Sequence, residues 1–376
     1  MRVLAVTNDY PPEIGGIGSY IHELYRRLPA HGIEVRVLAP AMPGDELFDA
    51  ASGLDVVRFP DRMVRATRAL SETMRRASAD RDLITLGSAL PMGFAATRTR
   101  LPVVLHTHNS EIYYDRFPVT RQMLRRLIQR TELATTLTEY TRIALEPAFQ
   151  GHPVLPLPPA VDLDRFHPDV NGSELRGRFG ISPARPLIVH AGRLVPRKGQ
   201  DVLITAMPLI RHAVPDAALL IIGSGPYEKR LRRLVQEHGL EDAVRFGGPV
   251  GWDELPQVYA AADVFATPCR SRYGGREVEG FGQVFLEAQA VGKPVIVGNS
   301  GGAPETTLDG VSGYVVDSLD ARTIADRISQ LLLDPALAAR IGRAGRAHVE
   351  ARFNWDVRAA SYAERLRGLV DRRQVA

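Results

Sequence analysis

The sequence has a single cysteine, Cys269, among its 376 residues. One thiol excludes an internal disulfide framework and a cysteine-based zinc ribbon, and it fits a reducing compartment. Long apolar runs are also lacking. The first one, Val3–Val6, is far shorter than a signal peptide or the roughly 18 residues of a spanning helix. These absences predict a cytosolic protein with an inert thiol.

Lysine is scarce as well, with three lysines against 44 arginines, and the formal net charge is +4. This charge is too small to indicate a nucleic-acid partner, but it suits anionic ligands or an anionic membrane face. Hydrophobic residues make up 45% and charged residues 24%, which is typical of a globular protein. The length is sufficient for two domains.

Short β-branched runs alternate with amphipathic stretches along most of the chain, which predicts parallel βαβ units. The expected strands are 2–7, 35–39, 55–59, 83–86, 102–106 and 133–137, then 187–190, 218–222, 244–246, 264–266, 294–297 and 313–316. A proline-rich passage, 153–168, separates the two series and predicts a stiff connector. We therefore expect an α/β protein with Rossmann-like domains at 1–165 and 166–355, and a C-terminal helix, 356–376, that returns to the first domain.

The first strand-to-helix turn contains Gly15, Gly16 and Gly18 before a helix that begins near Ile17. Glycines allow backbone amides to approach an anion at a helix N-terminus, so Gly15 and Gly16 are candidates for holding a phosphate. Their spacing does not match the dinucleotide fingerprint G-x-G-x-x-G, and a flexible turn remains the alternative.

The second domain places Arg193 and Lys198 after its own first strand. A forked guanidinium and a compact ammonium at this position predict a pair of cations that grips a diphosphate. Solvent-facing loop cations are the alternative.

Two carboxylates, Glu279 and Glu287, lie eight residues apart around a predicted helix start that contains Gly280, Phe281 and Gly282. One carboxylate can receive sugar hydroxyls at the helix mouth while the other reaches further along a nucleotide. Paired carboxylates also occur in glycoside hydrolases, but nothing in the chain indicates water as the acceptor.

His108 follows a strand at its carboxyl end, where ligands bind in open α/β sheets. It is a candidate for hydrogen bonding to a sugar. Together with His106 and Glu111 it lacks a fourth ligand, which argues against a metal site.

With these residues assembled, the sequence resembles the retaining GT-B glycosyltransferases of family 4, and most closely the actinobacterial phosphatidylinositol mannoside mannosyltransferases. The resemblance spans nearly the whole chain, from the turn 8–17 through Arg193 and Lys198 to Glu279, Glu287 and the segment 300–305.

The resemblance implies a GT-B fold, in which two Rossmann-like domains face a cleft. It also implies transfer of mannose from GDP-mannose, with retention and without a metal or other cofactor, to a phosphatidylinositol mannoside or related glycolipid. It places Gly16 under the donor phosphates, Arg193 and Lys198 at the departing diphosphate, and Glu279 at the donor sugar. It places Glu287 at the ribose and His108 at the mannose.

The segment 107–111 departs from the family pattern, because Asn109 and Ser110 stand where the lipid-directed relatives tend to have glycine and histidine. This departure concerns the acceptor more than the donor, so a soluble acceptor is one alternative. A UDP-sugar donor is another, because Arg193 and Lys198 do not indicate the base. Alternatives of a different class are a nucleotide-sugar epimerase of the same architecture and a nonenzymatic sugar-nucleotide binding protein.

Two basic amphipathic stretches, 62–76 and 116–130, are candidates for resting on the anionic inner face of the cell membrane. In that arrangement Met63, Val64, Leu124 and Leu127 would be buried in the bilayer. Ordinary solvated helix faces are the alternative.

Overall fold

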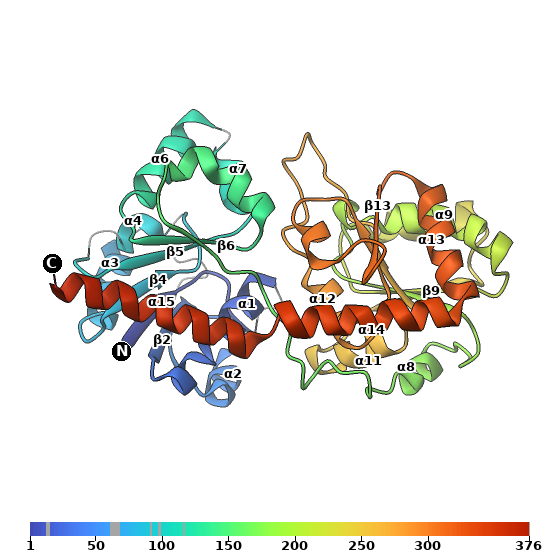
Figure 1. Cartoon of the computed structure of the whole chain (residues 1–376), viewed down its shortest axis with the longest axis horizontal. Helices are drawn as coiled ribbons and strands as arrows, with labels where there is room; N and C mark the ends of the chain where they lie inside the picture. The colour runs from blue at the N-terminus through green and yellow to red at the C-terminus, as the bar shows by residue number, and fades with distance from the viewer. Residues whose placement is uncertain (13–15, 61–67, 91, 97–98, 116, 376) are drawn as a thin grey trace. The chain divides into compact units, whose positions relative to one another are not determined.

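Figure 1 shows the computed structural model of the chain, which describes residues 1–12, 16–60, 68–90, 92–96, 99–115 and 117–375. The chain divides into two units. Unit 1 comprises Met1–Pro159 and Trp355–Ala376, and unit 2 comprises Ala160–Asn354. The divisions thus fall at 159/160 and 354/355, whereas the sequence suggested 165/166 and 355/356.

Unit 1 is built on a parallel sheet in the order β3-β2-β1-β4-β5-β6-β7. The strands are β1 (Arg2–Val6), β2 (Glu34–Pro40), β3 (Asp55–Phe59), β4 (Leu83–Leu86), β5 (Val103–Thr107), β6 (Leu133–Thr136) and β7 (Val154–Pro156). The helices are α1 (Gly16–Tyr25), η1 (Leu28–His31), α2 (Asp45–Ser52), α3 (Arg68–Ala77), α4 (Gly93–Ala96), α5 (Ser110–Asp115), α6 (Pro118–Ile128), α7 (Glu139–Phe149) and α15 (Trp355–Val375).

Unit 2 contains a second parallel sheet in the order β10-β9-β8-β11-β12-β13. Its strands are β8 (Leu187–Ala191), β9 (Ala218–Ile222), β10 (Val244–Gly248), β11 (Val264–Thr267), β12 (Val295–Gly298) and β13 (Gly313–Val316). The helices are α8 (Ser173–Arg178), η2 (Pro196–Lys198), α9 (Gln200–Ala213), α10 (Glu228–Glu237), η3 (Trp252–Glu254), α11 (Leu255–Ala260), α12 (Gln283–Ala290), η4 (Ala303–Thr306), α13 (Ala321–Leu333) and α14 (Pro335–Arg352).

The expected strands are all present, which confirms the periodicity argument. Strand β7 was missed, because it lies in the proline-rich passage that the sequence predicts as a connector. It is an edge strand that pairs with β6 alone and ends at Pro156. Proline is tolerated at such an edge because its missing N–H is not needed by a neighbouring strand.

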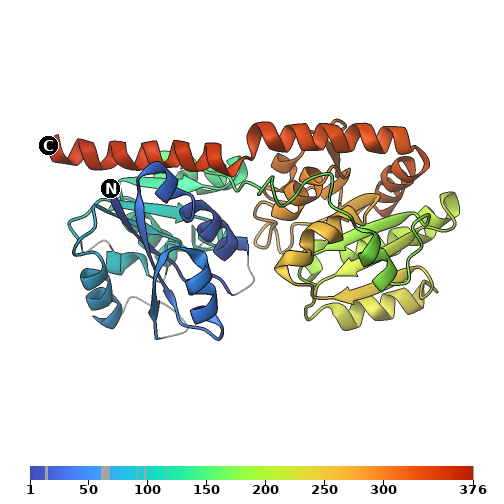
Figure 2. The same ribbon diagram turned by 90° about the horizontal axis from the view of Figure 1, so that it is seen from below.

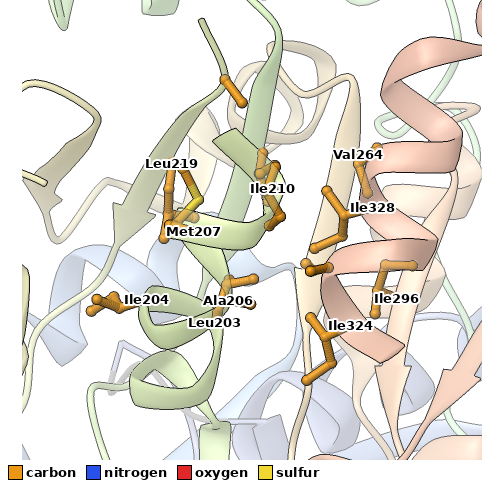
Figure 3. Close-up of a cluster of buried hydrophobic side chains, with 14 of the residues drawn as sticks. Leu203, Ile204, Ala206, Met207, Ile210, Leu219, Val264, Ile296, Ile324 and Ile328 are labelled. Atoms are coloured by element: carbon orange, nitrogen blue, oxygen red, sulfur yellow. The ribbon is translucent and has the colours of Figure 1, made fainter. Parts of the chain in front are cut away.

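Each unit has its own hydrophobic core. In unit 2, side chains of α9 and α13 pack against the sheet, among them Leu203, Met207 and Ile328 (Figure 3). The core of unit 1 includes Leu124 and Leu127 of α6. The expectation that these two leucines lie against a bilayer is therefore wrong, because helical periodicity turns them toward the sheet. Met63 and Val64 lie outside the described residues.

Helix α15 belongs to unit 1 although it follows unit 2 in the chain, and it runs along this unit in both views (Figure 1 and Figure 2). Its Tyr362 hydroxyl lies 3.0 Å from Nε2 of His106 on β5, and Tyr25 of α1 contacts the same nitrogen at 3.0 Å. Burial lowers the pKa of His106 to about 3, so the imidazole is neutral. This buried polar cluster links α1, β5 and α15.

Candidate active site

The turn after β8 in unit 2 brings a buried cation beside a buried carboxylate. Lys198 ends the short helix η2, and its Nζ lies 2.8 Å from Oε2 of Glu279. Arg197 donates from Nη1 to the same oxygen at 2.7 Å. The two residues that the sequence singled out, Lys198 and Glu279, thus lie together, and Arg197 is a contact that sequence reasoning missed.

Arg193, the other predicted cation, is exposed. Its backbone carbonyl accepts a hydrogen bond from Nε2 of Gln200 at 3.0 Å, which anchors the turn to the start of α9. Its charge is close enough to lower the pKa of Glu279 slightly, after the larger effects of Lys198 and Arg197.

Backbone contacts fix the position of Glu279 before α12. Its N–H donates to Oγ of Ser300 at 3.1 Å, and its carbonyl accepts from the N–H of Gly302 at 3.0 Å. Gly301 has a φ of +56°, and a Cβ there would lie 2.2 Å from the Glu279 carbonyl oxygen. Glycine is thus required at this position both by the left-handed backbone and by the close approach.

The charge of Glu279 is set by its neighbours. Burial alone raises the pKa of this carboxyl, but Lys198 and Arg197 outweigh burial and hold the pKa below its usual range. Glu279 is therefore ionised at neutral pH.

The pKa of Glu287 is shifted in the opposite direction from that of Glu279. Glu287 lies within α12, is buried, and accepts a hydrogen bond from the hydroxyl of Tyr259. Burial raises its pKa to about 7, although Tyr259 and the charges of Arg165 and Lys198 act against this. The two carboxyls therefore differ in protonation near pH 7, and so do not form a matched pair of carboxylates.

Backbone conformation and packing explain which residues stand between Glu279 and Glu287. Gly282 is the residue before the first turn of α12 and has a φ of +88°. The Phe281 ring is buried edge to face against Phe353, with centroids 5.8 Å apart. The Phe281 side chain thus contributes to packing within unit 2. Gly280 is half-buried.

In unit 1, His108 lies just beyond β5 and is buried. Its Nε2 is 2.8 Å from the carbonyl oxygen of Gly87, and its backbone N–H donates to Glu111 at 2.8 Å. Because a carbonyl only accepts, Nε2 carries the proton and Nδ1 is an acceptor. Among the described residues Nδ1 has no hydrogen-bond partner. Burial lowers the pKa of His108, which favours this neutral form.

Glu111 is a structural residue that shapes this turn. Its Oε1 accepts from the N–H of Ala89 at 3.1 Å, while Oε2 accepts from the N–H of His108 and from Oγ of Ser110 at 3.0 Å. Both carboxylate oxygens are thus occupied by the protein.

Asp9 is a second residue that sequence reasoning missed. Desolvation raises the pKa of its carboxyl, and the nearby His108 partly offsets this. Its place at the end of β1, next to β4 and near β5 in the sheet, is the signal that would have identified it. Gly16 begins α1, and Gly15 lies outside the described residues.

Cys269 is buried in unit 2, and burial raises the pKa of its thiol to about 12. It is therefore not a nucleophile at neutral pH. In the ranges that the structure describes, no group of three or more His, Cys, Asp or Glu side chains is arranged to hold a metal ion.

Two family models match the chain. Residues 14–165 match Glycosyltransferase Family 4, and residues 172–348 match Glycosyl transferases group 1. The GDP-mannose-dependent alpha-(1-6)-phosphatidylinositol monomannoside mannosyltransferase of Mycobacterium tuberculosis is 46% identical over 98% of both chains. The chain belongs to the group 1 glycosyltransferases.

Two other relatives of this glycosyltransferase carry similar names. The enzyme of the same name from Mycolicibacterium smegmatis is 42% identical over 99% of this chain and all of the relative. The GDP-mannose-dependent monoacylated alpha-(1-6)-phosphatidylinositol monomannoside mannosyltransferase of Corynebacterium glutamicum is 38% identical over 95% of both. All three are named as transferases, so they give no support to an epimerase.

Solved structures confirm the predicted fold class of this glycosyltransferase, which is GT-B. Sucrose-phosphate synthase from Thermosynechococcus elongatus superimposes with a TM-score of 0.81 at 23% identity, covering 98% of this chain and 99% of that one. Anabaena HepE in complex with UDP and glucose gives a TM-score of 0.81 at 23% identity, covering 98% and 100%. At this identity the likeness concerns the fold alone.

None of the helices in the described part of this glycosyltransferase is both long enough and apolar enough to cross a membrane.

Proposed function

We propose that the protein is an alpha-(1-6) mannosyltransferase that transfers mannose from GDP-mannose, with retention of anomeric configuration, to a phosphatidylinositol monomannoside. The names of relatives that are 38–46% identical over nearly the whole chain support the donor and the acceptor. The observation that carries the chemistry is the ion-paired group of Lys198, Arg197 and Glu279 at the carboxyl ends of the unit 2 strands.

The cations of this group suit a departing diphosphate. An ammonium has three donors, and the ion pair with Glu279 takes one of those of Lys198. In the described part of the chain the other two donors remain for phosphate oxygens, and the exposed Arg193 adds a forked donor. Negative charge grows on the leaving nucleotide in the transition state, so cations already in place there accelerate the reaction.

We assign the remaining roles by the chemistry of each side chain. Ionised Glu279 receives hydrogen bonds from donor sugar hydroxyls, and Glu287 receives the ribose hydroxyls. Nδ1 of His108, which has no hydrogen-bond partner in the described ranges, accepts a hydrogen bond from the mannose. Gly16, at the start of α1, lies under phosphate oxygens, and the main chain from Gly280 to Gly282 borders the donor. The phosphate-binding role of Gly15 is proposed from the sequence alone. No step of this scheme requires a metal.

The test of this function is a transfer assay with the full chain. Radiolabelled GDP-mannose and phosphatidylinositol monomannoside should give a labelled lipid whose new linkage is an α anomer by NMR. UDP-glucose as donor, or a water-soluble inositol phosphate mannoside as acceptor, should give far slower transfer. Equal rates with the UDP-sugar or with the soluble acceptor would contradict the assignment, and release of free hexose without transfer would contradict the reaction class.

A pair of variants separates catalysis from folding. Lys198→Met removes one of two cations from Glu279, so we expect a loss of ~1–3 kcal/mol in the free energy of unfolding. We expect a fall of about 10²–10³-fold in kcat, as for the loss of a preorganised donor at the developing charge.

The control variant is Arg176→Met. Arg176 is buried and donates to the carbonyls of Ala261 and Arg185 and to Asp263, at 2.8, 2.9 and 2.9 Å. Asp263 precedes β11, so this group lies at the amino end of the strands. Arg176→Met should cost at least ~3 kcal/mol in stability and leave kcat within about twofold. Equal losses of kcat in the two variants would show that the Lys198 effect is structural.

We propose an anionic membrane surface as the second partner. The region around α5 and α6 would bind this surface. The side chains of Tyr113, Phe117 and Val119 are exposed by 48, 47 and 72%, and the rings of Tyr113 and Phe117 meet edge to face at 5.3 Å. Helix α6 carries three arginines and no acidic residue. Aromatic side chains next to arginines are typical of surfaces that lie at a lipid headgroup layer.

A cavity near the C-terminal end of α6 suits the binding of an anionic lipid headgroup. Its volume is about 520 Å³, and its lining contains arginines and glutamines without a carboxylate: Gln122, Arg125, Arg126, Gln129, Arg130 and Gln150. This arrangement keeps the predicted basic stretch 116–130 as the membrane face, with different apolar residues from those that the sequence suggested.

Co-sedimentation with vesicles tests this surface. The double variant Arg125→Gln/Arg126→Gln should bind phosphatidylglycerol vesicles about 30-fold more weakly, at ~1 kcal/mol for each basic residue. The control Arg230→Gln/Arg233→Gln removes the same charge from α10, where Arg230 pairs with Glu237 at 3.0 Å. Equal weakening by both variants, or equal binding of the protein to phosphatidylcholine, would contradict the proposal.

A further inference from the structure

The guanidinium of Arg58 lies at the carboxyl end of β3 and contacts three parts of unit 1: α2, the end of β2 and the segment after β1. Its Nε and Nη2 donate to the two carboxylate oxygens of Asp49 on α2, at 2.9 and 2.7 Å. Its Nη1 donates to the carbonyl of Pro40 at the end of β2, at 3.0 Å, and Nη2 also donates to the carbonyl of Pro11, at 2.7 Å. The same group stands over the ring of Tyr10, 5.4 Å from its centroid. The side chain is 12% exposed.

These contacts hold the segment between β1 and α1. Tyr10 is fully buried, and its hydroxyl lies 3.2 Å from Nδ1 of His22 on α1. A Cβ at Gly18 would lie 3.2 Å from the backbone nitrogen of Tyr10, so α1 packs closely on the segment from its other side. The segment is therefore held between α1 and the Arg58 guanidinium.

The held segment connects Asp9 with the start of α1. Asp9 comes directly before Tyr10 and interacts electrostatically with His108. Pro11 and Pro12 lead toward Gly16, where α1 begins. A shift of the segment would move both the Asp9 carboxylate and the amides at the start of α1.

We infer that Arg58 is a positioning residue for the transfer reaction: it holds residues 9–12 so that Asp9 stays beside His108 and the amides at the start of α1 meet a phosphate group. That phosphate belongs to the donor diphosphate or to the phosphodiester of the acceptor. This inference rests on the proposed function. Lysine cannot replace Arg58, because one ammonium cannot bind a carboxylate with two parallel bonds and also reach two carbonyls.

The test compares Arg58→Lys with a control at the other end of the same sheet. Arg81 is also buried in an ion-pair group, and its Nη1 lies 2.9 Å from Glu34 at the start of β2. Arg81→Lys therefore perturbs a similar group far along the strands from the turn. Steady-state kinetics are measured with donor and acceptor varied separately, together with the free energy of unfolding.

We expect Arg58→Lys to lower kcat/KM about tenfold or more, because small displacements of positioned groups are costly in rate. Arg81→Lys should stay within about twofold of the wild type, even where its stability falls as much. The substrate whose KM rises identifies which phosphate the segment meets. A change of kcat/KM by less than twofold in Arg58→Lys, or equal losses in both variants, overturns the inference.

A second variant tests whether the effect of Arg58→Lys arises from the contact between Arg58 and Asp49. Asp49→Asn removes the carboxylate that orients Arg58, so it should lower kcat/KM in the same direction. The double variant Arg58→Lys/Asp49→Asn should lose less than the product of the two single losses, because both act through one contact. Multiplicative losses would show that the two residues act separately and overturn the inference.

Hydrogen exchange separates this inference from the proposed function. In the protein without ligand, the amides of Tyr10 and of Gly16 to Gly18 should exchange about tenfold faster in Arg58→Lys and at the wild-type rate in Arg81→Lys. A protein that transfers no mannose from GDP-mannose refutes the proposed function, and the exchange result then decides the positioning role by itself. Unchanged exchange in Arg58→Lys overturns it.

Discussion

Replacement of Glu287 by glutamine should change how the stability of unit 2 depends on pH. Glu287 is buried, and burial raises its pKa from 4.5 to about 7. Glutamine keeps the size of the side chain and an oxygen that can accept the Tyr259 hydroxyl, but it does not titrate. The variant thus removes the proton equilibrium and little else.

The sign follows from where each state releases its proton. Between pH 4.5 and 7 the unfolded chain has released the Glu287 proton and the folded protein has kept it, so the folded state binds more protons. The free energy of unfolding therefore falls as the pH rises through this range. A shift from 4.5 to about 7 corresponds to roughly 3 kcal/mol in total, as an order of magnitude.

The assay follows unit 2 alone. The chain has two tryptophans, Trp252 in unit 2 and Trp355 in unit 1. In a Trp355→Phe background, urea unfolding monitored by fluorescence reports on unit 2 through Trp252. The free energy of unfolding is measured from pH 4.5 to 8 with and without Glu287→Gln.

We compare the free energy of unfolding of the protein with Glu287 with that of the Glu287→Gln variant. The first minus the second should fall by about 3 kcal/mol between pH 4.5 and 8, with most of the change before pH 7. Glu254→Gln is the control. The pKa of Glu254 is lowered by its hydrogen bond from Arg178, so its own contribution rises with pH. If the free energy of unfolding with Glu287, minus that of the Glu287→Gln variant, does not change with pH or rises with pH, the reasoning is refuted.

Two further changes test other contacts. Gly301→Ala should destabilise unit 2 by ~3 kcal/mol or more, because its Cβ would collide with a backbone oxygen, whereas Gly310→Ala, with a φ of +73° and open space around it, should cost only ~1–2 kcal/mol. Urea unfolding checks both, and equal costs would contradict the close approach. Tyr362→Phe should destabilise unit 1 by ~1 kcal/mol, because it removes the hydrogen bond to buried His106. The fluorescence of Trp355 reports on this unfolding, and an unchanged midpoint would argue against the bond.

The strands could be predicted from the sequence because parallel strands buried on both faces read as short β-branched runs. The run from Ala218 to Ile222, for example, is buried throughout. Burial of a helix face was harder to predict. Leu124 and Leu127 lie between arginines in the sequence, and only the packing of α6 shows that they face the core. Strand β7 lacked the usual signal because its edge position tolerates proline.

Lys198, Glu279 and His108 could be singled out from the sequence because each stands in a loop that follows a predicted strand, and the structure brings Lys198 and Glu279 together. Arg197 was missed because its partner Glu279 lies 82 residues away in the chain, and no spacing indicates which of two adjacent cations turns inward. The protonation of Glu287 could not be predicted either, because it depends on burial beside Tyr259. The binding and catalytic roles of all the candidate site residues, Gly15 and Gly16 included, stay predictions.

The return of α15 to unit 1 has a consequence for how the polypeptide is made. Residues 1–159 leave the ribosome well before Trp355, Tyr362 and Leu366, which are all buried in the finished unit. Until unit 2 has been synthesised, the surface around Tyr25 and His106 has no cover. A nascent chain that stops before α15 therefore exposes this surface to chaperones and proteases. Unit 1 buries this surface only after α15 has been synthesised.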